Sequence, residues 1–285
     1  MRLTSLLAAP LFATSLFLTG CIGIDFDHGS SDKYQEDFHF SYDLQPNGQL
    51  VAETFNGKVE IIGWDENKVD ISGTKYGSTE RLRDSIKIDT HNAPSSVEVR
   101  AVHPSGSTGN SGARMTIKVP KQAVVERVTS SNGAIRIEHV GAISHVKTSN
   151  GTIRVTDASG DLDARTSNAQ IEVERFNGSL SARSSNGRIR AEGVTGKCDV
   201  ETSNASIDVR MDHATAAPIR LTTSNGAIEL ALDKAPKSDI HAQSSNGDRV
   251  KKDHLNGTLG NGGPAIDLET RNGSIRILKT TGTSN

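Results

Sequence analysis

Residues 149–155 read Ser-Asn-Gly-Thr-Ile-Arg-Val, a turn sequence followed by alternating apolar and polar residues. Near copies recur along the chain, first at intervals of 18 residues and then at intervals of 21 and 26. The asparagines of these copies are Asn132, Asn150, Asn168, Asn186, Asn204, Asn225, Asn246 and Asn272. A repeat of this length, with two short segments in each unit, predicts units that stack on one another to bury a shared apolar face.

Apolar residues alternate with polar ones inside each unit, which is the pattern of half-buried β-strands. Four residues after the serine stand Ile135, Ile153, Ile171, Ile189, Ile207 and Ile228, and Ile275 holds the same place in the last copy. Two residues further on stand Ile137, Val155, Val173, Ala191, Val209, Leu230 and Ile277. If the units stack about 4.8 Å apart, each of these positions becomes a column of aliphatic side chains inside a narrow tube.

Two folds have this spacing, because Asn-Gly between alternating strands is also a strong β-hairpin signal. Such a hairpin turn needs positive φ at both central residues, which is costly for Ala169 and Ala205, the residues that replace glycine in two copies. A stacked asparagine column, in which each side-chain amide bonds to the next, requires only that the asparagine persists. We therefore predict an all-β chain folded as a β-solenoid, similar to a parallel β-helix, with coils of about 18–21 residues. Cys198 falls in an apolar column and is expected to be an inert core residue.

The region before the repeats keeps the strand pattern without the strict period. Phe55-Asn56-Gly57 matches the later repeat, so residues 34–120 are expected to form a diverged N-terminal β cap on the same tube. No helix is expected after the first 20 residues. The predicted organisation is a signal peptide at 1–20, a tether at 21–33, the diverged β region at 34–120, regular repeats at 121–280 and a tail at 281–285.

The first 21 residues indicate export. An apolar run of about 16 residues is too short for a permanent membrane span and is typical of a secretory signal. Leu18-Thr19-Gly20-Cys21 resembles the bacterial lipobox, which implies cleavage before Cys21 and acylation of its thiol. Because acyl chains at one site give stable anchoring, we expect a membrane-anchored lipoprotein. Ile22 in place of aspartate favours the outer membrane if the source is Gram-negative.

A family resemblance rests on three stretches of sequence. These are Ile62-Gly63-Trp64-Asp65 followed by Val69, then Ile117-Lys118-Val119-Pro120-Lys121, then the repeated Asn-Gly-x-Ile units. Together they resemble the bacterial putative-adhesin family of β-strand repeats, a domain of largely unknown function, over about residues 34 to 280. The resemblance implies an exported or membrane-anchored β-solenoid and supplies no catalytic residues.

Composition and spacing exclude several classes of protein. The chain has 32 basic and 34 acidic residues, without the basic excess of a nucleic-acid binder. Its histidines are scattered and its two cysteines far apart, so we predict neither a metal site nor a cofactor. With Cys21 acylated, Cys198 has no partner for an intrachain disulfide.

The strongest binding signal is an outward column of cations on consecutive coils, made by Lys147, Arg165 and Arg183. Like charges on paired strands repel, so something is expected to compensate them. The simpler hypothesis is that Glu201 in the same column, with Asp163 and Asp199 beside it, neutralises these cations. The alternative is that the cations bind an anionic polymer such as surface polysaccharide.

A catalytic signal is weaker. Asp163 and Asp199 lie two coils apart, about 9.6 Å, near the upper limit for an inverting glycosidase, but exposed carboxylates on a flat sheet are expected to be solvated. We therefore predict no catalytic residues and no enzyme. Trp64 could stack on a carbohydrate, although a lone tryptophan beside strands is more often packed.

The predicted function is that of a membrane-anchored envelope lipoprotein whose repetitive surface serves adhesion or binding, with the lipid bilayer and a surface polysaccharide or envelope protein as partners. The first alternative is a periplasmic scaffold or envelope-stress component that acts through protein contacts. A carbohydrate-active β-helix enzyme is the second alternative.

Overall fold

The structure is a computed structural model that describes residues 32–102, 106, 109–211, 217–232, 239–246, 250–253 and 263–279. Four predicted features lie wholly or almost wholly outside these residues. They are the signal peptide, Cys21, nearly all of the tether, and the tail. The described residues form strands and one short helix. The strands are β1 Tyr34–Asp43, β2 Gln49–Glu53, β3 Val59–Trp64, β4 Lys68–Gly77, β5 Lys87–Ala93, β6 Ser96–Val102, β7 Ser111–Pro120, β8 Val124–Thr129, β9 Ile135–Val140, β10 Ala142–Lys147, β11 Ile153–Arg165, β12 Ile171–Ser184, β13 Ile189–Val194, β14 Cys198–Thr202, β15 Ile207–Met211, β16 Ile219–Thr223, β17 Ile228–Leu232, β18 Ile240–Ser244, β19 Val250–Asp253, β20 Ile266–Thr270 and β21 Ile275–Lys279.

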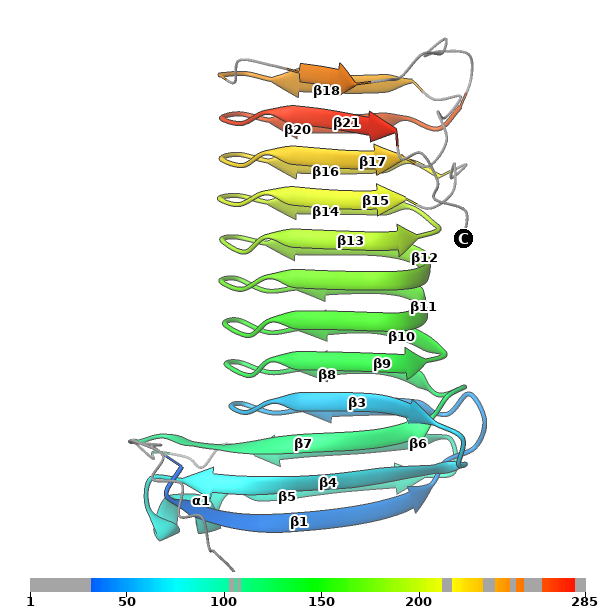
Figure 1. The fold of residues 1–285 in the computed structure, drawn as a ribbon. Helices are drawn as coiled ribbons and strands as arrows, with labels where there is room; N and C mark the ends of the chain where they lie inside the picture. The colour runs from blue at the N-terminus through cyan, green and yellow to red at the C-terminus, as the bar shows by residue number, and fades with distance from the viewer. Residues whose placement is uncertain are drawn as a thin grey trace, which may run out of the picture. The chain divides into compact units, whose positions relative to one another are not determined.

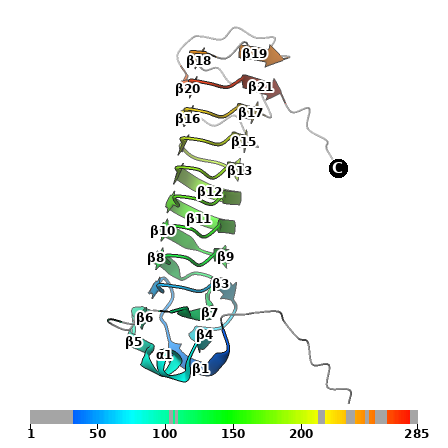
Figure 2. The same ribbon diagram turned by 90° about the vertical axis from the view of Figure 1, so that its left-hand side faces the viewer.

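Apart from β4, α1 and β5, the described residues between 49 and 279 stack as rungs, and each rung contributes to two facing sheets (Figure 1, Figure 2). Equivalent strands pair in parallel, so β8, β10, β11, β12, β14 and β16 follow one another in one sheet. Strands β9, β11, β12, β13, β15 and β17 form the facing sheet, because β11 and β12 pass through the corner and contribute to both. The predicted β-solenoid is confirmed.

The core is the set of aliphatic columns expected from the period. Ile135, Ile153 and Ile171 pair in register, and the column continues to Ile275 with every member buried. Each well-buried aliphatic side chain stabilises the fold by roughly 1.5–3 kcal/mol. Cys198 is fully buried in one column, and burial raises the pKa of its thiol to about 12, so the thiol is protonated at neutral pH.

One corner of each rung carries an asparagine ladder. Each Nδ2 donates to the Oδ1 of the asparagine one rung below, with distances between 2.5 and 2.9 Å. The ladder starts at Asn56, whose own Nδ2 donates to the carbonyl of Ser111. Among the described residues of these turns only Gly57 has positive φ, so the described turns are not hairpin turns.

A column of buried hydroxyls lies beneath the ladder and was not anticipated, although a serine or threonine precedes each asparagine by two residues. Thr148 Oγ1 donates to the carbonyl of Gly133 one rung below, and Thr166 Oγ1 donates to that of Gly151. Thr202 and Thr270 repeat the pattern. Buried hydroxyls with partners cost little and hold successive turns together.

The opposite corner carries residues in the left-handed backbone region at intervals of 18. These are His139, Asp157 and Arg175 with φ of 58°, 52° and 50°, followed by Gly193 at 68°. Arg175 Nε lies 2.5 Å from Asp157 Oδ1, and His139 Nε2 lies 3.4 Å from Asp157 Oδ2. The hydrogen bond from Arg175 is the main reason that the pKa of Asp157 is lowered.

The order of the rungs departs from the order of the sequence at both ends. Strand β16 pairs with β20, and β18 pairs with β20 on its other side, so residues 266–279 lie between the rungs at 219–232 and 240–253 (Figure 1). At the other end, β2 lies between β6 and β8, and β3 lies between β7 and β9. The rung at 240–253 is therefore the last of the described rungs.

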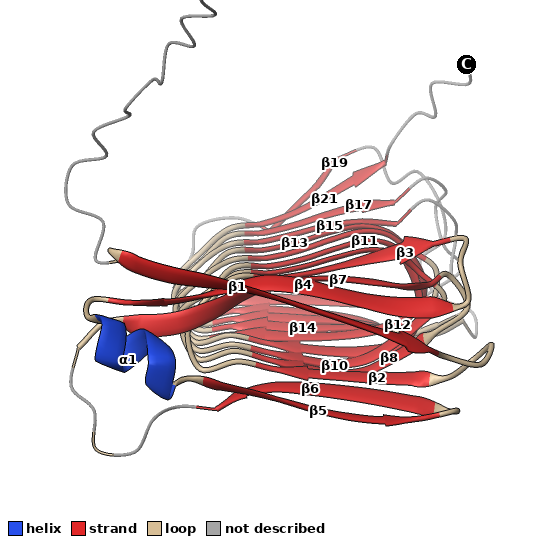
Figure 3. Ribbon diagram, turned by 90° about the horizontal axis from the view of Figure 1, so that it is seen from below, coloured by secondary structure: helices blue, strands red, loops and turns tan. Residues whose placement is uncertain are grey.

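The N-terminal end is closed by antiparallel strands. Strand β4 pairs with β7 and β1 with β4, while β5 pairs with β6 on the other side (Figure 3). Phe38, Phe40 and Tyr42 point inward from β1 and pack against the core.

The expectation of no helix was wrong at α1, Glu80–Ser85. Thr79 caps it by accepting the amide of Leu82, with Glu80 in the first turn and Arg83 in the last. Six residues are too few for a hydrophobic period, which is why the sequence pattern did not reveal this helix.

Candidate binding groove

The predicted cation column lies on the outer face of the sheet that contains β8, β10, β11, β12 and β14. Lys147 pairs in register with Arg165, and Arg165 pairs with Arg183. Their neighbours Val146, Ala164 and Ala182 are buried, and because side chains alternate along a strand, the three cations point to solvent. Glu201 follows in the same column, opposite Arg183.

The column is neutralised unevenly. Arg165 donates from Nε to Asp163 Oδ1 at 2.9 Å, and its Nη2 lies 2.8 Å from Oδ2. This bidentate hydrogen bond raises the pKa of the Arg165 guanidinium. Arg183 is shared between Asp199 at 3.3 Å and Glu201 at 3.5 Å. Lys147 is exposed and has no ion pair with any residue that the structure describes.

Two adjoining hollows make these side chains part of one groove. The first, of about 390 Å³, is lined by Arg127, His145, Lys147, Asp163 and Arg165 among others. The second, of about 320 Å³, shares Lys147 and Arg165 and continues to Arg183, Glu201 and the serines of the turns. The groove therefore crosses the strands from β8 to β14, with cations along it and hydroxyl groups on its turn side.

The two candidate catalytic carboxylates form ion pairs with arginines on this surface. Both oxygens of Asp163 contact Arg165, and Asp199 contacts Arg183. Ser181 lies between them in their column and pairs with both, and His145 pairs with Asp163 on its other side. A glycosidase needs two carboxyl groups facing a bound sugar from opposite sides, and these two lie on one open face.

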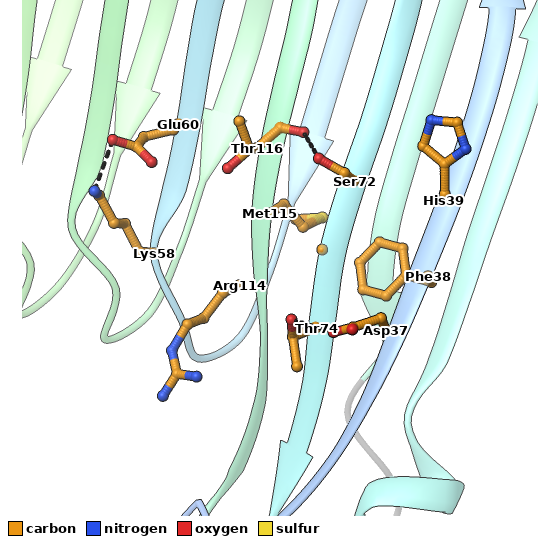
Figure 4. Close-up of a pocket in the computed structure, with 11 residues that line it drawn as sticks. Asp37, Phe38, His39, Lys58, Glu60, Ser72, Thr74, Arg114, Met115 and Thr116 are labelled. Carbon is orange, nitrogen blue, oxygen red and sulfur yellow. Dashed lines mark hydrogen bonds and ion pairs between the residues drawn. The ribbon is translucent and has the colours of Figure 1, made fainter. Parts of the chain in front are cut away.

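A third hollow lies on the N-terminal end, where β1, β3, β4 and β7 meet (Figure 4). It encloses about 620 Å³ over the small side chains of Ser72, Thr74 and Thr116. Its charged side chains already have partners, some of them from outside the hollow. Lys58 contacts Glu60 at 2.7 Å, His39 contacts Asp70 at 2.7 Å, and Asp37 accepts from Thr74. Sequence patterns could not find it, because its residues come from four strands of the aperiodic region.

Trp64 is packed rather than free. Its Nε1 donates to the carbonyl of Lys68 at 2.8 Å, and the ammonium of Lys118 lies 5.4 Å from the centroid of its ring. The ring is half-buried, its N–H has a hydrogen-bond partner, and a lysine lies over one face. Little of the ring surface is therefore free to stack on a sugar.

The described part of the chain contains no group of three or more His, Cys, Asp or Glu side chains that could hold a metal ion. None of its helices is long and apolar enough to cross a membrane.

The rungs, the asparagine ladder and the capped end define a repetitive β-solenoid protein. Residues 51–278 match the family described as Toastrack DUF4097, and the chain belongs to this family. The family resemblance proposed from the sequence is confirmed. A search of curated proteins found no match.

Several solved structures resemble the chain at low identity. A "putative adhesin" from Parabacteroides distasonis is 11% identical, with a TM-score of 0.48 over 85% of this chain and 97% of the other. A "putative adhesin" from Bacteroides fragilis is 11% identical, with a TM-score of 0.40 over 86% and 97%. A "putative lipid binding protein" from Parabacteroides distasonis is 11% identical, with a TM-score of 0.34 over 88% and 98%.

Proposed function

We propose that this protein is an exported, lipid-anchored binding protein that holds an acidic polysaccharide in the groove across β8 to β14. The observation that carries the proposal is the continuity of the two hollows through Lys147 and Arg165. An extended polymer fits this shape better than a compact ligand, because the two hollows together form an open groove that crosses successive strands from β8 to β14.

The charge distribution favours an acidic ligand over a neutral one. Lys147 lacks a carboxylate partner among the described residues, and the side chain of Arg165 is 54% exposed even with Asp163 beside it. An exposed cation gains from an anionic ligand without losing a buried ion pair. The exposed hydroxyls of Ser167 and Ser185 line the same groove and can donate to or accept from sugar hydroxyls.

Membrane attachment is the second part of the proposal and rests on the sequence around Cys21. Acylation there would keep the binding surface at the cell envelope, where acidic polysaccharides are found. The Cys21→Ser substitution removes the acylated thiol and provides a soluble form for binding measurements.

The test is a triple substitution, Lys147→Ala with Arg165→Ala and Arg183→Ala, in the Cys21→Ser background. We expect binding to a polyuronic acid to weaken about ten-fold, since three exposed ion pairs of about 0.5 kcal/mol each are lost. Binding by the parent should also weaken with rising salt. Isothermal titration calorimetry with neutral dextran as the comparison ligand measures both effects.

The matched control removes three arginines from the opposite sheet. Arg136, Arg154 and Arg190 lie in one outward column there and are 44–48% exposed, so their triple alanine variant loses the same charge. Equal weakening in both variants would show that only net charge matters and would overturn the groove as the binding site. Unchanged binding in the first variant would do the same.

A further inference from the structure

The asparagine ladder contains a chemically labile dipeptide repeated in nearly constant surroundings. Asparagine is labile because the backbone nitrogen of the next residue can attack its side-chain carbonyl carbon. The new N–Cγ bond closes a cyclic imide, the Cγ–Nδ2 bond breaks, and ammonia leaves with the proton from the attacking nitrogen. Water then opens the imide to aspartate or isoaspartate, so the reaction needs no partner besides water. Glycine as the next residue leaves the nitrogen least hindered.

Three of the ladder glycines have this nitrogen restrained. The N–H of Gly133 donates to Ser130 Oγ at 2.9 Å, that of Gly151 to Thr148 Oγ1 at 3.2 Å, and that of Gly187 to Ser184 Oγ at 2.9 Å. All three glycines are buried. The hydroxyl column thus holds the attacking nitrogen, keeps its proton engaged and excludes the water that would remove it.

Among the described ladder turns after that of Asn56, two glycines lack this restraint. Gly226 and Gly273 are only half-buried, and their N–H groups have no hydrogen-bond partner among the residues that the structure describes. Thr223 and Thr270 still donate to carbonyls one rung below, so the hydroxyls are present but do not accept from these glycines. At these two turns the attacking backbone nitrogen therefore lacks a hydrogen bond, and the glycine is also more exposed to water.

We propose that Asn225 and Asn272 are sites of spontaneous deamidation, and that the hydroxyl column protects Asn132, Asn150 and Asn186 from the same reaction. The modification would act on the ladder itself. Asn225 Nδ2 donates to Asn204 Oδ1 at 2.9 Å, and a carboxylate there has no proton to donate. Two oxygens would then face each other between the rungs at 198–211 and 219–232, which weakens the attachment of the last three described rungs.

The sequence supplies a matched pair for the test. Ser131-Asn132-Gly133-Ala134-Ile135 and Ser224-Asn225-Gly226-Ala227-Ile228 have the same residues in the same order. In the folded full chain at mildly alkaline pH, we expect Asn225 to deamidate at least about five-fold faster than Asn132, which is the factor that one hydrogen bond is worth. Peptide mapping by mass spectrometry measures both sites in one sample. In urea the two rates should become equal.

A substitution tests the cause. Ser130→Ala removes the hydroxyl that accepts from Gly133, and we expect it to bring the rate at Asn132 toward that at Asn225, while Ser130→Thr keeps the slow rate. Hydrogen exchange at β8 and β9 checks that the variant rung remains folded. If Ser130→Ala unfolds that rung, the rates at Asn132 and Asn225 in the unsubstituted chain still test the proposal. Equal rates at Asn132 and Asn225 in the folded chain would overturn the proposal.

Discussion

Replacing Leu268 by lysine is expected to detach the last two described rungs from the stack. Leu268 is 1% exposed and lies between Leu221 of β16 and Ala242 of β18. A lysine there leaves an uncompensated charge in the core, which destabilises by about 3–5 kcal/mol. Hydrogen exchange should show lost protection over 240–246 and 266–279, with the rungs below unchanged.

Ala242→Lys is the control, because Ala242 occupies the same column in the outermost described rung and is half-buried. Its lysine can reach solvent, so the loss should stay below about 1 kcal/mol and 266–279 should remain protected. If the rungs followed sequence order, Ala242 would be the inner residue and Leu268 the outer one. The opposite ranking of the two variants would therefore contradict the observed order.

Phe176→Ala is expected to produce the largest loss of any single truncation in the regular rungs, about 3–5 kcal/mol. Phe176 is fully buried and is the largest of the fully buried side chains. It pairs with Ala158 on one side and Val194 on the other, so its ring fills the space that the small Ala158 leaves. Neither neighbour can close the cavity. The midpoint of urea unfolding, followed by circular dichroism, measures the loss.

Val194→Ala provides the comparison for Phe176→Ala, since it truncates a buried side chain in the same column. Fewer atoms are removed, so we expect a clearly smaller loss. Equal losses in the two variants would mean that the column collapses around either gap, and that Phe176 has no special packing role.

Much of the fold could be predicted because the physical constraint repeats. Each rung must supply an apolar residue to each core column, so Ile153, Ile171 and Ile189 recur at a fixed interval and pair in the structure. The persistence of asparagine where Ala169 replaces glycine pointed to stacked turns, and Asn168 hydrogen bonds to the asparagines above and below it.

The order of the end rungs could not be predicted from spacing. Ile240 and Ile266 have equivalent places in the pattern, and either could pair with Ile219. The side chains distinguish them, since 266–279 supplies Leu268 and Ile277 to the core columns, whereas Ala242 and Lys252 hold those register positions in 240–253. The more apolar rung occupies the inner place, where both of its faces are covered.

The candidate groove was predictable in part. Alternation placed Lys147, Arg165 and Arg183 on one outward column, and the observed register agrees. Which carboxylate neutralises which cation depends on side-chain rotamers, so the isolation of Lys147 and the bidentate contact between Arg165 and Asp163 became visible only in the structure. The left-handed residues at 139, 157 and 175 had no signal either, because none of them is glycine.

Engineered disulfides give the most direct test of the stacking order on which this account depends. Thr222 pairs in register with Glu269, and Glu269 with Gln243, so Thr222 and Gln243 lie two rungs apart, about 9.6 Å. A disulfide requires Cα atoms about 4.4–6.8 Å apart. After oxidation in the Cys21→Ser background, Thr222→Cys with Glu269→Cys should form an intrachain disulfide, and Thr222→Cys with Gln243→Cys should not. A disulfide between positions 222 and 243, with none between 222 and 269, would contradict the order in which the rung at 266–279 lies between those at 219–232 and 240–253.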